Sequence, residues 1–145
     1  MPWVKIDEKF YQHPKVVEVG PLGMAMQVAA LCYCNQNLTD GFVPYNAADT
    51  LLPWKFLGED TDRGRKLYRI SVSCGMHGED ATAGFVIELL LDAGMWEEVD
   101  GGYQIHDFKD YQPTKEEVLA ERDRKKEAGR LGGLAKAEAH RLAKP

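Results

Sequence analysis

Two clusters of basic side chains are the residues of this sequence best suited to chemistry. One contains Arg63, Arg65, Lys66 and Arg69, and the other contains Arg122, Arg124, Lys125, Lys126 and Arg130. Ammonium and guanidinium groups hold phosphates, and Tyr68 could stack on a base, so both clusters could bind nucleic acid without reading its sequence. The alternative is a solvated surface, because acidic residues lie close by: Glu59, Asp60 and Asp62 at the first cluster, and Glu117, Glu121 and Glu127 at the second.

The spacing of the second cluster fits a helix. Residues three or four apart share a helix face, so Lys126 lies beside both Arg122 and Arg130. The same rule places Glu121 beside Lys125, which is ordinary support for an exposed helix. This positive face could hold nucleic acid or dock on an acidic partner, or it could be only a solvated helix.

A metal site would need Cys32, Cys34, Cys74 and His77, the only plausible ligand set in the sequence. Cys74 and His77 have ligand-like spacing. Cys32 and Cys34, however, are two residues apart on an expected helix and therefore do not share a face. We interpret the cysteines as small buried hydrophobic residues and the histidine as a surface residue, and we expect no metal.

His106 beside Asp107 could suggest acid–base chemistry. No nucleophile, phosphate-binding loop or pair of catalytic carboxylates accompanies them in the sequence. We therefore expect an edge-strand histidine bonded to its neighbours, no enzymatic activity and no cofactor.

The charge of the chain is divided between its two parts. Residues 1–113 carry nine Lys and Arg against 17 Asp and Glu, a formal charge of −8, whereas residues 114–145 carry nine against six, a charge of +3. An acidic body followed by a basic arm is typical of a folded domain with an interaction segment, and a basic arm suits a polyanion. We expect a body over 1–113 and a helical, partly mobile tail over 114–145.

Hydrophobic spacing and turn residues predict the elements of the body. A short strand or extended segment is expected at 3–6 and a helical stretch at 7–19, with Phe10, Tyr11, Val16 and Val17 in the core. A central helix over 22–36 follows from apolar residues three and four apart, with Leu22, Ala25, Met26, Ala29 and Tyr33 on its main face. A strand at 42–43 and a helix at 47–52, capped by Asn46, complete the first half.

The second half begins with the stretch 55–79, which contains four glycines and is interpreted as an insertion. Asp80 is expected to cap a helix over 81–93, and Gly94 stands where a C-terminal glycine belongs. An Asp-Gly turn predicts a hairpin over 96–106. Thr114 and Glu117 form a capping box for a tail helix that should end near residue 128, because three glycines follow.

The order of these elements and one long motif resemble a known family. The motif is Leu91-Asp92-Ala93-Gly94-Met95-Trp96-Glu97-Glu98-Val99-Asp100-Gly101-Gly102-Tyr103-Gln104-Ile105-His106-Asp107-Phe108, supported by 3–7, 40–44 and the Gly- and Arg-containing segment 128–135. It is similar to winged-helix domains of phage and prophage replication proteins of the replisome-organiser or initiator type. The resemblance implies a mainly α winged helix-turn-helix with a small β-hairpin, and DNA binding by helix 81–93 and wing 97–104.

The residues themselves do not support that docking mode. A recognition helix presents Arg, Lys, Asn or Gln to bases and phosphates, and residues 81–93 contain none of them. The expected exposed residues are Thr82, Glu88 and Asp92, and the wing carries Glu97, Glu98 and Asp100, which repel phosphate. Two hypotheses remain: nucleic-acid binding through the two basic clusters, or an acidic protein-binding module of these five carboxylates that meets a host or phage protein, in the manner of an inhibitor or DNA mimic.

Location and assembly follow from composition. The start of the sequence lacks the apolar stretch of a signal peptide, and no run approaches 18 apolar residues, so we expect a cytoplasmic protein that does not enter membranes. Three cysteines do not make a disulfide framework. The apolar helix 22–36 and the tail helix could supply a homodimer contact.

Overall fold

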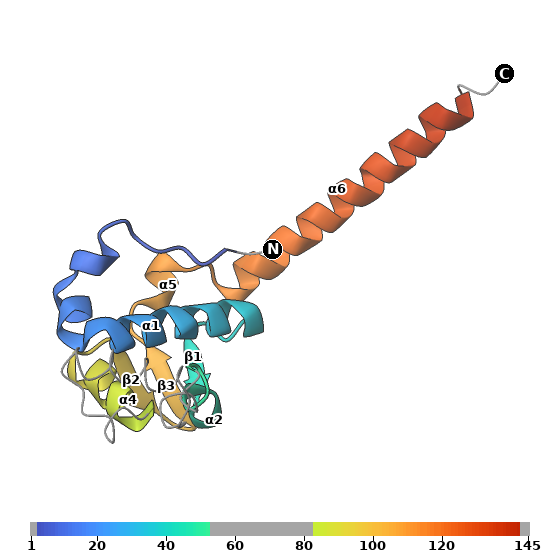
Figure 1. Ribbon diagram of the computed structural model, residues 1–145. Helices are drawn as coiled ribbons and strands as arrows, with labels where there is room; N and C mark the ends of the chain where they lie inside the picture. The colour runs from blue at the N-terminus through green and yellow to red at the C-terminus, as the bar shows by residue number, and fades with distance from the viewer. Residues whose placement is uncertain (1–2, 53–82, 143–145) are drawn as a thin grey trace, which may run out of the picture. The chain divides into compact units, whose positions relative to one another are not determined.

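The computed structural model describes residues 3–52 and 83–142. The chain divides into two compact units, residues 1–112 and 113–145. The first unit is mainly helical with a small three-stranded antiparallel sheet, and the second contains one long helix (Figure 1). The mostly α composition with a β-hairpin agrees with the sequence prediction.

Helix α1 (Pro14–Asn37) is the central element of the first unit. Its helical geometry breaks at Gly20, which has φ of 66° and ψ of −171°, and Pro21 begins the second run. Glycine accepts this positive φ without the clash of a Cβ, and proline suits a first helical turn. The predicted helix 22–36 is therefore present, and the helical turns from Pro14 up to the break at Gly20 belong to the helical stretch predicted at 7–19.

The buried face of α1 differs from the predicted one. Met26 and Ala30 are fully buried, but Ala25 is exposed and the polar Gln27 and Asn35 are buried. The expected core contacts Tyr11 and Val17 were wrong: their exposures are 62% and 63%. The apolar spacing allows two neighbouring helix faces, and packing against helix α4 (Ala83–Asp92) selects one of them.

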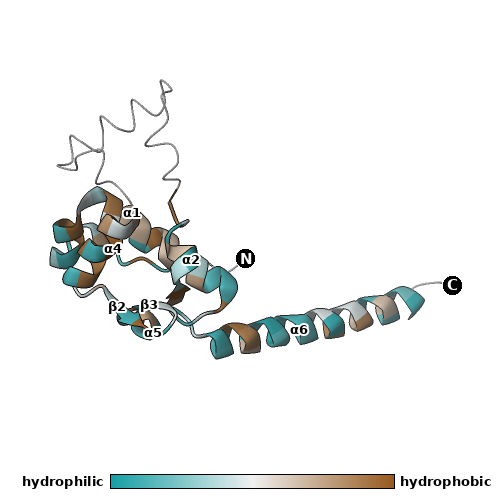
Figure 2. Cartoon of the chain, turned by 90° about the horizontal axis from the view of Figure 1, so that it is seen from below, coloured by the Kyte–Doolittle hydropathy of each residue, from teal (hydrophilic) through white to brown (hydrophobic). Residues whose placement is uncertain are grey.

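By length and composition, α1 is also apolar enough to cross a membrane. In the structure its buried residues belong to the core of the first unit, where they pack with residues of α4 and the sheet. Figure 2 shows apolar residues along α1 and mostly hydrophilic residues along the tail helix.

In the described residues 3–9 there is no strand, so of the two alternatives for 3–6 the strand was wrong, and the first regular element is the short 3-10 helix η1 (Phe10–Gln12). Hydrogen bonds from the side chain of Gln112 hold this segment against the rest of the first unit. Its side-chain Oε1 accepts from the Lys5 backbone N at 3.2 Å and from Asn35 Nδ2 at 3.1 Å, and its Nε2 donates to the Lys5 carbonyl at 2.5 Å. The side-chain amide of Gln112 thus satisfies both the backbone N–H and the backbone carbonyl of Lys5, as a neighbouring strand would.

Strand β1 (Phe42–Pro44) leads directly into helix α2 (Tyr45–Ala48). The predicted cap at Asn46 and the helix over 47–52 were wrong, because Pro44 occupies the N-cap position and Asn46 lies inside the helix. A proline in β1 is tolerated because this strand forms an edge of the sheet.

Helix α4 ends as its sequence predicts. Gly94 has φ of 62°, its N–H donates to the Leu91 carbonyl at 2.9 Å, and the Met95 N–H donates to the Leu90 carbonyl at 2.9 Å. These two bonds are the Schellman pattern, in which a glycine with positive φ closes the helix. Strand β2 of the hairpin begins directly after this turn.

Strands β2 (Trp96–Val99) and β3 (Gly102–Ile105) form the predicted hairpin, and the strand order is β1-β3-β2. Trp96 pairs with Ile105 and is 1% exposed, and its indole N–H donates to Gln27 Oε1 at 2.6 Å. This bond satisfies the buried indole and joins the hairpin to α1. Short helix α5 (Phe108–Tyr111) follows and buries Phe108.

Candidate nucleic-acid interface

Helix α6 (Lys115–Leu142) forms the second unit and carries the tail cluster. It begins with the predicted capping box: the Thr114 N–H donates to Glu117 Oε2 at 2.9 Å, and the Glu117 N–H donates to Thr114 Oγ1 at 3.3 Å. Each side chain satisfies a backbone donor that the first turn leaves unpaired. The start of the helix is therefore fixed by residues adjacent in sequence.

The predicted end of this helix near residue 128 was wrong. Gly129, Gly132 and Gly133 lie inside a continuous helix that runs to Leu142. The surrounding alanines, leucines, lysines and arginines favour helix, and their summed propensity outweighs a cost of about 1 kcal/mol for each glycine. A Cβ at any of the three positions would meet no atom within 4 Å, so these glycines leave the backbone accessible.

Three cations of the tail cluster pair with carboxylates on the helix. Arg124 and Lys125 both contact Glu121, Lys125 at 3.2 Å, and Arg130 donates to the two carboxylate oxygens of Glu127 at 2.9 and 2.7 Å. The Arg130 guanidinium holds the pKa of Glu127 below its usual value. The predicted Glu121–Lys125 pair is confirmed, and all these groups are exposed, so each pair adds little stability.

The other two cations of the cluster, Arg122 and Lys126, make no ion pair within the described residues, and neither does Lys136. These three share one side of the helix with Gly129 and Gly133, because successive members of the series 122, 126, 129, 133 and 136 are three or four residues apart. We name Arg122, Lys126 and Lys136 the free cationic stripe. The sequence analysis did not predict Lys136 as a binding residue, because the tail helix was expected to end near residue 128, before this lysine.

Four of the six carboxylates of α6 share another side, and Glu117 and Glu121 lie outside that group. Glu116, Asp123, Glu127 and Glu138 are separated by seven, four and eleven residues, which are whole numbers of turns to a good approximation. On the side of the helix that carries the free cationic stripe, positions 122, 126, 129, 133 and 136 hold only cations and glycines and no carboxylate. Cations and carboxylates are mixed over the rest of the helix, but between residues 122 and 136 this one side carries cations and glycines without a carboxylate and can approach phosphates.

Helix α4 presents the opposite charge. Its exposed residues are Gly84, Glu88 and Asp92, spaced by four, and residues 83–92 contain no Lys, Arg, Asn or Gln. The expected exposure of Glu88 and Asp92 is confirmed, whereas Thr82 lies outside the described residues. A surface of this composition offers no donor for base edges and repels phosphates.

The wing carboxylates do not form a single surface. Glu97 pairs with Gln104 and Glu98 with Tyr103, so their side chains lie on opposite faces of the sheet. Glu98 Oε1 accepts from the Tyr45 hydroxyl at 3.0 Å, and this bond raises the pKa of Tyr45. Asp100 is exposed in the hairpin turn.

The histidine predicted on an edge strand follows the central strand instead. His106 comes directly after β3, which lies between β1 and β2. Its Nδ1 lies 3.1 Å from Glu97 Oε1 and its Nε2 lies 3.2 Å from Asp107 Oδ2, so the expected local bonding is present. The hairpin brings residue 97 back beside residue 106.

The candidate metal ligands separate in the structure. Cys34 is buried and Cys32 is exposed, so the interpretation of Cys32 as a buried residue was wrong. Burial raises the pKa of the Cys34 thiol to about 11. In residues 3–52 and 83–142, no three His, Cys, Asp or Glu side chains form a metal-binding group. Cys74, His77 and the basic cluster Arg63, Arg65, Lys66 and Arg69 lie outside these ranges.

Comparison with known proteins gives no relative: no family model, no curated protein and no solved structure matches the chain.

Proposed function

We propose that the first unit is a winged helix and that the chain is a phage-type, non-enzymatic protein of DNA replication or regulation. The element order α1, β1, α2, α4, β2, β3 supports this, as does the antiparallel pairing of β1 with the returning strand of the hairpin. The motif over 91–108 is a second support. In this proposal residues 55–79, which lie outside the described residues, are interpreted as an insertion in the winged helix.

We further propose that DNA is held by α6, together with the cluster Arg63, Arg65, Lys66 and Arg69, and not by α4. The observation that carries this proposal is the free cationic stripe, whose three cations have no carboxylate partner on their own helix. A cation already bonded to a carboxylate must give up that bond to contact a phosphate, whereas an unpaired one gives up only water and counterions. Contacts of this kind are independent of sequence.

Fluorescence anisotropy with two labelled duplexes of unrelated sequence tests the proposal on the full chain. We expect similar affinities for both duplexes and a strong decrease in affinity as salt rises. A variant in which the free cationic stripe and the 63–69 cluster are changed to glutamine should lose most of this binding. Tight binding that survives both changes would refute it.

The acidic protein-binding module is a second candidate function. Glu88, Asp92, Glu97, Glu98 and Asp100 are all exposed, and α4 lacks every side chain that a recognition helix uses. Because Glu97 and Glu98 lie on opposite faces of the sheet, a single basic surface of a host or phage protein would complement Glu88 and Asp92 of α4 with only part of the wing carboxylates. The test is cross-linked capture from infected-cell extract by the full chain and by an E88Q/D92N variant. A partner captured equally by both would contradict a role for α4.

A further inference from the structure

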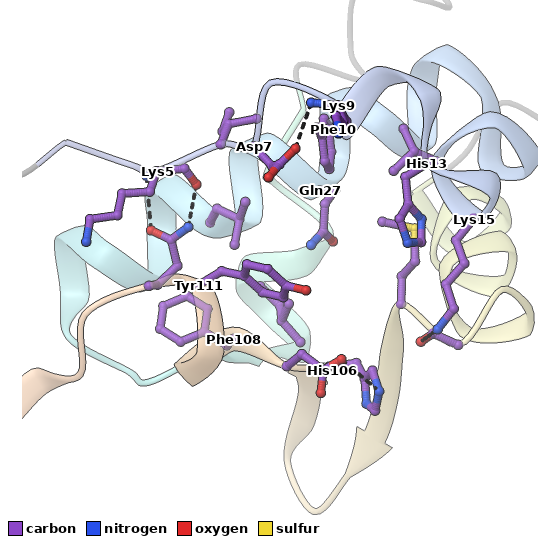
Figure 3. Close-up of a pocket in the computed structure, with 18 residues that line it drawn as sticks. Lys5, Asp7, Lys9, Phe10, His13, Lys15, Gln27, His106, Phe108 and Tyr111 are labelled. Atoms are coloured by element: carbon purple, nitrogen blue, oxygen red, sulfur yellow. Dashed lines mark hydrogen bonds and ion pairs between the residues drawn. The ribbon is translucent and has the colours of Figure 1, made fainter.

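The first unit contains a cavity of about 390 Å³ that none of the proposed contacts uses. It lies between the N-terminal segment, the start of α1, the turn before β2, the end of β3 and α5 (Figure 3). Neither the exposed carboxylates of α4 nor any residue of α6 lines it. Its volume falls in the range of small-molecule sites.

The walls are apolar and the interior contains a polar donor without a partner. Val16, Leu31, Met95, Ile105 and Phe108 contribute buried apolar surface. Gln27, 7% exposed, points from α1 into this space in Figure 3. Its Oε1 accepts from the Trp96 indole, and its amide nitrogen has no hydrogen-bond partner among the described residues. Among the described residues, Thr39 Oγ1 is the only fully buried side-chain polar atom without a partner, so the Gln27 amide nitrogen is accessible from the cavity and can donate to a ligand that brings an acceptor.

The charges around this cavity differ from those of the rest of the body. Residues 3–52 and 83–112 contain four Lys and Arg, and three of them, Lys5, Lys9 and Lys15, line the cavity. The same ranges contain 12 Asp and Glu, of which only Asp7 and Asp107 line it. The Lys15 ammonium is fixed at the wall by a 2.9 Å bond to the Gly94 carbonyl. Among the described residues of this acidic unit, the cavity therefore has most of the positive charge and can accept a negative group with less repulsion than the carboxylate-rich surfaces.

We infer that this cavity binds a small amphipathic anion, an organic acid with an apolar body. The apolar body contacts the walls formed by residues such as Met95 and Phe108, and an anionic oxygen accepts from the Gln27 amide. Lys15 at the wall and the exposed Lys5 and Lys9 at the rim stabilise its charge through their field, although the Lys5 ammonium points away from Gln27 in Figure 3. The site would serve a small-molecule ligand and is independent of nucleic-acid binding by α6.

Two fluorescent probes of nearly identical shape test the inference. Anilinonaphthalene sulfonate carries an apolar aromatic body and one anionic group, and phenylnaphthylamine has the same body without the charge. We expect one sulfonate probe per chain and an affinity for it at least about tenfold greater than for the neutral probe, a ratio equivalent to about 1.4 kcal/mol. Equal affinities, or no binding of the sulfonate, would overturn the inference.

Substitutions locate the binding. Lys5 and Lys9 are exposed, so K5Q/K9Q should fold normally and weaken sulfonate binding about threefold to tenfold, with little effect on the neutral probe. K109Q is the matched control, because Lys109 is the remaining described lysine of the body and does not line the cavity. The loss of sulfonate affinity is compared per positive charge removed, one in K109Q and two in K5Q/K9Q. Equal losses per charge would overturn the inference, because the net charge of the unit would then explain both.

Gln27→Glu tests the donor itself. The new carboxyl group keeps an acceptor for the Trp96 indole but, measured at a pH high enough to ionise it, replaces the amide donor with a negative charge that repels the sulfonate. We expect sulfonate binding to fall by more than tenfold while the neutral probe still binds, with folding checked by thermal denaturation. Unchanged sulfonate binding by a folded Q27E chain would overturn the inference. DNA affinity measured on the same variants should remain at the parent value, which separates this site from the function of α6.

Discussion

Replacing the free cationic stripe should change the salt dependence of DNA binding more than an equal change of charge elsewhere on α6. The test variant is R122Q/K126Q/K136Q, and the matched control is R124Q/K125Q/R130Q. Each removes three positive charges from the same exposed helix. They differ because the control cations are already paired with Glu121 and Glu127, whereas the test cations have no such partner.

The expected magnitude follows from counterion release. Each phosphate contact contributes about 0.9 to the slope of log affinity against log salt, so three lost contacts reduce the slope by about 2.7. When salt rises from about 50 to 200 mM, the affinity of the test variant for DNA should therefore fall by a factor about 40 times smaller than the factor by which the affinity of the parent falls. The control should lose less than about 1 in slope, because it removes net charge but few phosphate contacts.

Anisotropy titrations of a labelled duplex at five or more salt concentrations give both slopes. The full chain is used throughout, and circular dichroism verifies that the helix content of both variants equals that of the parent. Equal reductions of slope in the two variants would show that only net charge matters. A parent slope retained by the test variant would refute the assignment of phosphate contacts to the stripe.

Three further predictions concern the first unit. Gln112→Ala should lower the free energy of unfolding by about 2–4 kcal/mol in urea denaturation, because three hydrogen bonds of a buried side chain are lost together. Gly102→Ala should cost more than about 2 kcal/mol in the same assay, because a Cβ would lie 2.3 Å from the Val43 carbonyl oxygen, and backbone must move. At pH 8, a thiol reagent followed by peptide mapping should label the exposed Cys32 long before Cys34, whose pKa of about 11 keeps it protonated up to that pH. Labelling of Cys34 at an equal rate would contradict its burial.

The features predicted correctly are those decided by neighbours in sequence. The capping box of Thr114 and Glu117, the glycine closure at Gly94 and the Asp-Gly hairpin each depend on residues within five positions of one another. Incorrect predictions arose where the local signal was ambiguous. Asn46 is a good cap residue, but the helix already begins at Tyr45 with Pro44 at the N-cap, and the glycines of α6 did not outweigh the propensity of the residues around them.

The sequence by itself therefore determined the capping box, the glycine closure and the hairpin turn, together with the acidic body, the basic tail and the absence of Lys, Arg, Asn and Gln from residues 83–92. Only the tertiary structure decided which side of α1 is buried, that Glu97 and Glu98 face opposite sides of the sheet, and that Lys5, Gln27 and Met95 share a cavity. The physical reason is the range of the forces involved. Caps and turns are closed by bonds between near neighbours, whereas a cavity and a buried face depend on how segments far apart in the sequence pack together.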